Sequence, residues 1–372
     1  MKILYCCSTL ERTGPTSQLF NIVTGVINSR SEVIVVTLSS EKENSLKDKF
    51  EKAGVNVVCL DEAGVLGIKG LSQRLLGLIN DGAIECVHTQ GIRSDMIMSL
   101  LTNKVSVRWI STLRNIPYLD YPAQYGKFKG WVMAVTHILA LQRCKNLVVV
   151  SHSLKKPLQR FFRRNINVVP NGIDTEFYSN TNTPLDEIAT IRHEIQLSPD
   201  DRVLVYTGVL EERKNLVSIL NSIDKLDGFR LLLVGDGSLA DELASHPATK
   251  IGKAVLVGAV SDVRPYILMA DAFLLLSKAE GLPNSALESL SLGCPVILSD
   301  IGPHQEIKEK ANNCAQLIDL AEDEGLTDFL KVRYDDWIRG LSQGECREIA
   351  DYSFSARVNS NAYQELYRLG KS

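Results

Sequence analysis

The chain alternates, over its whole length, between short apolar runs and longer segments with helical periodicity. Residues 2–8 and 272–276 are examples of the apolar runs, which are continuous rather than alternating. Such runs are typical of parallel strands that are buried on both faces. After an apolar run, apolar residues recur three or four positions apart, as at Leu19, Ile22 and Val26. This spacing predicts helices between the strands. This order predicts α/β architecture, with doubly wound parallel sheets that carry helices on both faces.

The predicted strands form two groups. They are residues 2–8, 33–38, 55–60, 84–89, 107–112, 147–151 and 167–170 in the first group, and 203–207, 230–234, 254–257, 272–276 and 296–298 in the second. A chain of 372 residues is long enough for two domains, each with its own core. The chain therefore divides into two predicted Rossmann-like domains.

The predicted boundary lies at Pro170-Asn171-Gly172, because Asn-Gly favours a turn. The first domain is predicted over residues 1–172 and the second over residues 173–353. The remaining segment, residues 354–372, is predicted to be an amphipathic helix. Its expected apolar face comprises Val358, Ala362, Leu366 and Leu369.

Two carboxylates flank a predicted helix start just after the strand at 272–276. Glu280 precedes the helix, which is expected to begin near Asn284, and Glu288 lies about one turn inside it. The free N–H groups at a helix start, here from Leu282 onwards, favour an anion such as a diphosphate. A carboxylate on each side of that site suits hydroxyl groups. The pattern predicts a ligand with two sugar-like parts joined through phosphate.

A basic pair, Arg213 and Lys214, enters another predicted helix after a strand and a Gly turn. Two cations in that place can neutralise a diphosphate. A surface salt bridge to Glu211 or Glu212 is the alternative.

Polar residues also follow strands in the first domain. The loop at Gly14-Pro15-Thr16 has the length of a phosphate loop, but it lacks Gly-x-Gly-x-x-Gly, which disfavours a dinucleotide dehydrogenase. His88 and Arg114 lie at later strand ends, where ligands of parallel sheets collect. Tyr118 opens a tyrosine-rich stretch, residues 118–128, which is predicted to be either a recognition loop or a packed surface loop.

The net charge of −3 hides a division along the chain. Residues 1–175 carry 22 Lys and Arg against 13 Asp and Glu, whereas the rest carries 19 against 31. Residues 101–170 carry twelve basic residues and one acid, Asp120. This excess predicts an anionic partner for the first domain. The basic and aromatic residues 155–164 are predicted to lie on one helix that contacts an anionic membrane face, with a plain solvated helix as the alternative.

Glu280 and Glu288 enclose seven residues, filled here by Gly281-Leu282-Pro283-Asn284 and its continuation. This stretch resembles the Glu-x7-Glu signature of retaining nucleotide-sugar glycosyltransferases of family 4, which have the GT-B fold. Further similarity lies in Pro-Asn-Gly-Ile-Asp at 170–174, Gly-Asp-Gly at 235–237 and the segment 257–260. Two positions depart from the family. Val209 replaces a usual Arg, which Arg213 is expected to compensate, and Arg114 replaces a usual His.

The resemblance implies two domains that face each other across a cleft, and a role for each matching residue. Arg213 and Lys214 would balance the donor diphosphate and act in catalysis with Glu280, whose carboxylate would bind the transferred sugar. Glu288 would bind the ribose. The other implied donor-binding residues are Gly14, Val260, Gly281, Leu282, Pro283 and Asn284. His88, Arg114 and Tyr118 are candidates for the acceptor or sugar side.

The implied reaction is sugar transfer with retention from a UDP- or GDP-linked donor to a saccharide on a polyprenyl diphosphate, in O-antigen or capsule assembly. No cofactor or metal is expected, because Arg and Lys supply the positive charge and Asp-x-Asp is absent. A nucleotide-sugar epimerase and a non-catalytic nucleotide-binding subunit are the alternatives. Nucleic-acid binding is disfavoured because no recognition motif accompanies the basic residues.

The sequence predicts a cytoplasmic protein held peripherally at the inner face of the plasma membrane. Residues 1–8 are too short for the apolar part of a signal peptide, and the apolar helical run at 132–141 is shorter than the roughly 20 residues that span a bilayer. The cysteines show no metal-ligand spacing and lie mostly in or beside apolar runs, which is typical of reduced, buried thiols.

Overall fold

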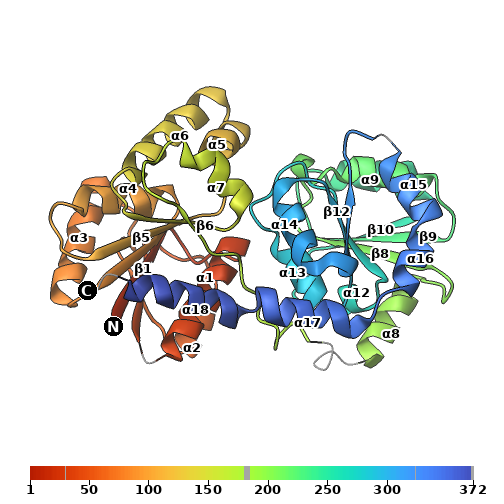
Figure 1. The fold of residues 1–372 in the computed structure, drawn as a ribbon, viewed down its shortest axis with the longest axis horizontal. Helices are drawn as coiled ribbons and strands as arrows, with labels where there is room; N and C mark the ends of the chain where they lie inside the picture. Colours follow the sequence, from red (N-terminus) through yellow and green to blue (C-terminus); the bar gives the residue numbers. More distant parts are fainter. Residues whose placement is uncertain (30, 180–184, 323, 370–372) are drawn as a thin grey trace. The chain divides into compact units, whose positions relative to one another are not determined.

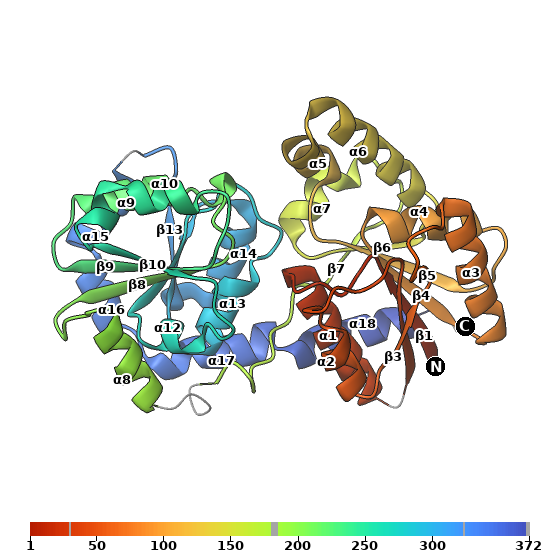
Figure 2. The same cartoon turned by 180° about the vertical axis from the view of Figure 1, so that it is seen from behind.

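The computed structural model describes residues 1–29, 31–179, 185–322 and 324–369. The chain forms two compact units, drawn in Figure 1 and, from behind, in Figure 2. Unit 1 comprises Met1–Gly172 and the described residues from Ala356 onwards, and unit 2 comprises Ile173–Ser355. The last three residues of the predicted terminal segment lie outside the described ranges.

Unit 1 contains a seven-stranded parallel sheet in the order β3-β2-β1-β4-β5-β6-β7. Its strands are β1 (Lys2–Cys7), β2 (Glu32–Thr37), β3 (Asn56–Cys59), β4 (Cys86–Gln90), β5 (Arg108–Leu113), β6 (Asn146–Val149) and β7 (Asn167–Val168). Every strand lies within one or two residues of a predicted apolar run. The interior of the sheet is therefore built from local sequence patterns.

Helices cover both faces of this sheet. They are α1 (Gly14–Ile27), α2 (Lys47–Lys52), α3 (Ile68–Asp81), α4 (Ile92–Leu101), α5 (Pro117–Tyr125), α6 (Lys127–Leu141), α7 (His152–Gln159) and α18 (Ala356–Arg368). Helix α18 packs against α1 on one face, while α4 packs against α3 and α6 on the other (Figure 1). The doubly wound arrangement predicted for this part of the chain is confirmed.

Unit 2 contains a six-stranded parallel sheet in the order β10-β9-β8-β11-β12-β13. Its strands are β8 (Arg202–Thr207), β9 (Phe229–Val234), β10 (Ala254–Gly258), β11 (Ala272–Leu275), β12 (Val296–Ser299) and β13 (Ala315–Ile318). Its helices are α8 (Leu185–Glu194), η2 (Glu212–Lys214), α9 (Leu216–Asp224), α10 (Ala240–Ser245), α11 (Pro247–Lys250), α12 (Arg264–Leu268), α13 (Asn284–Ser291), α14 (Gly302–Ala311), η3 (Asn312–Cys314), α15 (Gly325–Val332), α16 (Tyr334–Arg339) and α17 (Gln343–Phe354). The sequence analysis made no prediction for β13, α8, α15, α16 or α17.

Both sheets reverse their strand order beside their first strand. The reversal falls between β1 and β4 in unit 1, and between β8 and β11 in unit 2. Neighbouring loops diverge at such a point, so a ligand can enter beyond the carboxyl ends of the two strands. The loops after β8 and β11 carry Arg213, Lys214 and Glu280, which places these residues at the reversal point of unit 2.

The terminal helix buries only part of the predicted apolar face. Ala362 and Leu366 pack against the core of unit 1, as predicted, whereas Val358 is partly exposed and Leu369 is largely exposed. The prediction missed Tyr363 and Tyr367, which are buried. The Tyr367 hydroxyl bonds the Tyr5 hydroxyl at 3.0 Å and lies 2.7 Å from His88 Nδ1, because a buried tyrosine needs a partner for its hydroxyl.

Two further local predictions are wrong. The tyrosine-rich stretch 118–128 is not a loop, since α5 and α6 occupy almost all of it. The basic segment 155–164 is not one exposed helix: α7 ends at Gln159, Phe162 is buried, and the Arg164 guanidinium donates to the Leu141 carbonyl.

None of the helices in the described ranges is both long enough and apolar enough to cross a lipid bilayer.

Candidate functional site

The predicted catalytic residues of unit 2 form one charged cluster. Glu280 Oε1 lies 2.6 Å from Lys214 Nζ, and Glu280 Oε2 lies 3.1 Å from Arg213 Nη1. The Glu280 side chain is only 9% exposed, so little water screens these contacts. The structure thus joins the adjacent pair Arg213 and Lys214 with Glu280, which lies 66 residues beyond Lys214, into one polar centre.

Backbone contacts hold the two loops of this cluster together. The Lys278 N–H donates to the Arg213 carbonyl at 2.9 Å, and Arg213 Nη1 donates to the Ala279 carbonyl at 2.5 Å. Asn215 ends the short helix η2 with a left-handed backbone (φ 58°), which turns the chain into α9 directly after Lys214. The positions of the two cations are therefore set by the loops as well as by ion pairing.

Arg213 also forms the salt bridge that was the alternative reading of the sequence. Its Nη2 lies 2.6 Å from Glu211 Oε1, in the exposed part of the cluster. Lys214 is more enclosed and contacts only Glu280 among the ion pairs of the described residues. Arg213 thus forms ion pairs with both Glu211 and Glu280.

Electrostatics keep Glu280 ionised. Burial alone would raise the pKa of this carboxyl, but the charges of Lys214 and Arg213 outweigh burial and hold its pKa below the usual value. A carboxylate in this state accepts hydrogen bonds from hydroxyl groups and donates none.

Glu288 lies on α13 in a different environment. Burial raises the pKa of its carboxyl to about 7, and a hydrogen bond with the Tyr178 hydroxyl opposes part of that rise. Sequence analysis missed Tyr178, which lies shortly after the predicted domain boundary and carries no motif. The two signature carboxylates therefore differ: Glu280 is paired with cations, and Glu288 is paired with a neutral hydroxyl.

The remaining predicted donor-binding residues of unit 2 lie in two loops. Gly281, Leu282 and Pro283 connect Glu280 to α13, whose first residue is Asn284, as predicted. The Leu282 side chain is buried. Val260 lies just beyond the end of β10 and is half-buried.

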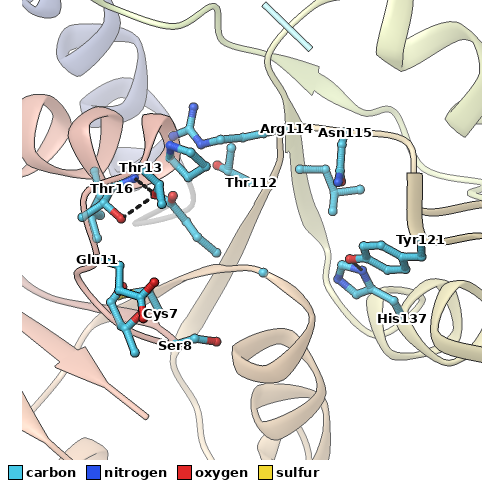
Figure 3. A pocket seen from close by; sticks show the side chains of 16 residues that line it. Cys7, Ser8, Glu11, Thr13, Thr16, Thr112, Arg114, Asn115, Tyr121 and His137 are labelled. Carbon is cyan, nitrogen blue, oxygen red and sulfur yellow. Dashed lines mark hydrogen bonds between the residues drawn. The ribbon is translucent and has the colours of Figure 1, made fainter. Parts of the chain in front are cut away.

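Unit 1 contains a pocket of about 300 Å³ at its own reversal point (Figure 3). Its walls come from the loop after β1 and the start of α1, from the ends of β4 and β5, and from α5 and α6. The lining residues are Cys7, Ser8, Thr9, Glu11, Thr13, Pro15, Thr16, Leu19, Gln90, Gly91, Thr112, Leu113, Arg114, Asn115, Tyr121 and His137. Hydroxyl and amide groups dominate the polar part of this wall. Gly14 starts α1 between two lining residues but does not line the pocket itself.

Arg114 lines this pocket and is incompletely hydrogen-bonded. One of its terminal nitrogens, Nη1, donates to Asn171 Oδ1. The remaining guanidinium nitrogens, Nε and Nη2, are buried and have no hydrogen-bond partner in the described part of the chain. A buried guanidinium with spare N–H groups favours an oxygen-rich ligand.

The other two acceptor-side candidates are placed outside the pocket. His88 is fully buried, and both ring nitrogens are used, by the Tyr367 hydroxyl and by Thr112 Oγ1 at 2.8 Å. Burial, assisted by the charge of Arg114, lowers the pKa of His88 to about 3, so the ring is neutral. Tyr118 packs its ring against Phe161, at 5.4 Å between centroids. His88 therefore lies inside unit 1 and does not line this pocket, and the tyrosine that lines it is Tyr121.

A buried polar chain leads from the core to the pocket. His137 Nε2 lies 2.8 Å from Asp95 Oδ2, and His137 Nδ1 lies 2.8 Å from the Tyr121 hydroxyl. Thr89 donates to the other Asp95 oxygen. Sequence analysis missed this chain, although a histidine inside the apolar run at 132–141 was an available signal.

Together, these arrangements combine fixed cations, an ionised carboxylate and a separate polar pocket. Such groups can bind a phosphate-linked sugar and a hydroxyl-bearing partner. No group of three or more His, Cys, Asp or Glu side chains within the described ranges could hold a metal ion.

Two family models match the chain. "Glycosyltransferase Family 4" matches residues 13–177 and "Glycosyl transferases group 1" matches residues 201–331. The two ranges fall one in each half of the chain and together take in most of it.

Curated relatives carry related names. The chain is 29% identical over 208 residues to a putative teichuronic acid biosynthesis glycosyltransferase, TuaC, of Bacillus subtilis, a match that spans 55% of this chain but only half of that relative. It is 24% identical over 312 residues, 82% of each chain, to the O-antigen biosynthesis glycosyltransferase WclY of Escherichia coli. A third match, 25% identical and covering 54% of each chain, is an E. coli α-1,3-galactosyltransferase named for a GlcNAc-diphosphoundecaprenol acceptor.

Solved structures show the same fold. Anabaena HepE in complex with UDP superposes with a TM-score of 0.81 at 16% identity, covering 98% of this chain and 99% of that one. The two parallel-sheet units therefore have the GT-B fold. With glycosyltransferase models matching both halves and similarly named relatives, the chain is a glycosyltransferase of the family 4 type.

Proposed function

We propose that this protein moves a sugar, with retention, from a nucleoside-diphosphate sugar to a saccharide carried on a polyprenyl diphosphate during assembly of a bacterial surface polysaccharide. The observation that carries the proposal is the cluster of Glu280, Lys214 and Arg213 beside the start of α13. Charge builds on the departing nucleoside diphosphate in the transition state, and fixed cations stabilise it more there than in the bound donor.

Each side chain has a defined part in this proposal. Lys214 and Arg213 lie against the donor phosphates, Glu280 accepts hydrogen bonds from hydroxyls of the transferred sugar, and Glu288 accepts them from the ribose. Donor phosphates compete with Glu280 for the two cations, because these cations are ion-paired with it in the structure described here. The positive charge comes from side chains, so the reaction is proposed to need no metal.

The acceptor side is assigned to the pocket of unit 1. Arg114 has two nitrogens, Nε and Nη2, that have no hydrogen-bond partner among the described residues and could donate to acceptor oxygens, and Thr13, Asn115 and Tyr121 add neutral donors and acceptors. The lipid-linked acceptor in the name of one E. coli relative and the O-antigen role in the name of another support the choice of acceptor class. UDP in a structure with the same fold supports a uridine donor, with GDP as the second choice.

The test is product analysis with purified protein. UDP- and GDP-sugars are supplied with and without a polyprenyl-diphosphate-linked saccharide, and nucleoside diphosphate, glycolipid and nucleotide sugar are quantified. Transfer predicts glycolipid formation that depends on the acceptor, and NMR of the new linkage reports whether the anomeric configuration of the donor is kept. A new nucleotide sugar made without acceptor identifies an epimerase and contradicts the proposal.

A further inference from the structure

Helix α6 exposes an apolar face to solvent. Five side chains form what we term the α6 stripe: Phe128, Trp131, Val132, Val135 and Leu139. Their spacing of three and four residues puts them on one side of the helix. Phe128 is 86% exposed, Trp131 is 52% exposed and Leu139 is 62% exposed. Large apolar side chains gathered in this way mark an interaction surface.

The opposite face of α6 is the buried one. Its residues are Gly130, Ala134, His137 and Leu141, of which only Leu141 is a large apolar side chain. At Gly130 a Cβ atom would lie 2.3 Å from the Pro122 nitrogen and from the Tyr121 carbonyl oxygen, so only glycine allows α6 to lie this close to α5. The helix thus packs on unit 1 through a side that carries fewer large apolar side chains than the stripe.

The contacts of this buried face prevent α6 from rotating so that the stripe would be buried. His137 is fully buried and bonded to Asp95 on one side and to Tyr121 on the other. Rotating α6 to bury the stripe would leave Asp95 Oδ2 without its histidine partner and Asp95 with only its hydrogen bond from Thr89, and a buried carboxylate oxygen that loses its partner is unfavourable. The outward position of the apolar side chains is therefore built into unit 1.

The surroundings of the stripe are basic. Lys127 and Lys129 are exposed at the start of α6, and neither forms an ion pair within the described ranges. Lys145 is exposed just beyond the end of the helix. The single acid of residues 101–170, Asp120, accepts a hydrogen bond from the Ile116 N–H and so stays at the start of α5.

We propose that the α6 stripe docks onto the surface of an anionic lipid bilayer. An apolar helix face flanked by lysines is the arrangement of helices that lie in the interface of a membrane, with apolar side chains among the acyl chains and lysines at the headgroups. The helix spans about 22 Å, given 1.5 Å for each of its 15 residues. It therefore lies on a bilayer and does not cross it.

The inference rests on the proposed function, because it explains how a lipid-linked acceptor reaches the pocket of unit 1. Tyr121 of α5 and His137 of α6 line that pocket with the inward side of the same helical pair (Figure 3). The docking surface also differs from the one predicted from the sequence. The basic residues of 155–164 that remain exposed, such as Lys156 and Arg163, lie outside α6 and supply charge but no exposed apolar face.

The test is co-sedimentation of the full chain with vesicles. The vesicles contain phosphatidylcholine alone or with about one third phosphatidylglycerol. The test variant combines Phe128→Gln, Val135→Gln and Leu139→Gln, and a matched control combines Val65→Gln, Ile251→Gln and Val332→Gln, which are equally exposed apolar residues elsewhere. Wild type and control are expected to bind the anionic vesicles, and the test variant at least tenfold more weakly.

Tryptophan fluorescence gives a second readout that does not depend on the triple variant folding well. Anionic vesicles should shift the emission of wild type to shorter wavelength, and Trp131→Phe should remove this shift. Wild type that ignores anionic vesicles, or a test variant that binds as well as wild type, overturns the inference. A wild-type dimer in light scattering that the test variant dissociates, without vesicle binding, also overturns it and assigns the stripe to a second copy of the chain.

Failure of this inference and failure of the proposed function are distinguishable. Transfer by wild type is measured in parallel on a water-soluble acceptor that lacks the polyprenyl chain. Transfer without vesicle binding overturns docking alone. Vesicle binding without any transfer overturns the proposed reaction and leaves the docking surface in place.

Discussion

The site residues of unit 2 and those of unit 1 occupy equivalent places in two similar sheets but are built from different chemistry. Unit 2 gathers full charges, with Glu280 held 2.6 Å from Lys214. Unit 1 lines its pocket with hydroxyls and amides around Arg114. Fixed charges suit a ligand part that every donor shares, namely phosphate. Neutral groups suit a saccharide, whose many hydroxyls differ between acceptors. In two units with the same fold, the loops at the strand ends therefore decide which ligand each unit can bind.

The largest effect is expected from removing a cation of unit 2. Lys214→Met should lower kcat by about 100- to 1000-fold, which is the usual cost of one contact that acts on transition-state charge. Lys225→Met is the matched control, because Lys225 also pairs with a glutamate, Glu324, but at the exposed surface. Steady-state rates of nucleoside diphosphate release measure both. Equal losses in the two variants would contradict the role of the cluster.

Removing the charge of Arg114 in unit 1 should weaken acceptor binding and leave donor binding unchanged. Arg114→Met is expected to raise the acceptor KM by about 10- to 100-fold, since a hydrogen bond to a charged group is worth roughly 1.5–3 kcal/mol. Donor affinity, measured by calorimetry, should stay unchanged. Arg160→Met serves as control, because the Arg160 guanidinium lies over the Tyr118 ring and not in the pocket. A weaker donor affinity in Arg114→Met would contradict the proposal that unit 2 binds the donor and unit 1 binds the acceptor.

The pH dependence of donor binding should follow Glu288. Its pKa of about 7 means that the carboxyl is mostly protonated at pH 6 and mostly ionised at pH 8. Ribose hydroxyls bind the ionised form better, so donor affinity should rise by up to about tenfold across this range, and binding near pH 6.5 should release protons. Calorimetry in two buffers measures the release. Glu288→Gln should remove the pH dependence, whereas Glu280 stays ionised throughout because its pKa is lowered.

The smallest effect is expected from a single hydroxyl beside the pocket. Tyr121→Phe leaves His137 Nδ1 without its partner inside the unit and should cost roughly 1 kcal/mol in unfolding free energy. Tyr118→Phe, in the neighbouring turn of α5, should change stability by less than that. Urea unfolding of both variants compares them. If both variants lost the same unfolding free energy, the hydrogen bonds through His137 would add nothing to the stability of unit 1.

The places of the residues in the cluster of unit 2 could be predicted because their signals are local. A strand, a Gly turn and a helix start set the places of Arg213, Lys214 and Glu280 through short-range patterns. The pocket of unit 1 was harder to predict. His88 was predicted to lie at a strand end, but it lies in the middle of β4, where Tyr367, 279 residues away, binds its ring. No pattern near His88 could reveal this contact.

The alternation of strands and helices follows from the sequence alone, and with it two parallel sheets whose strand ends carry the polar residues. These features depend on hydrophobic period and turn chemistry, which act over a few residues. Three other features follow from tertiary packing: Glu280 pairs with Lys214, α18 buries tyrosines, and α6 exposes Phe128. These outcomes depend on which distant groups share a buried volume, because packing and desolvation there outweigh local preference.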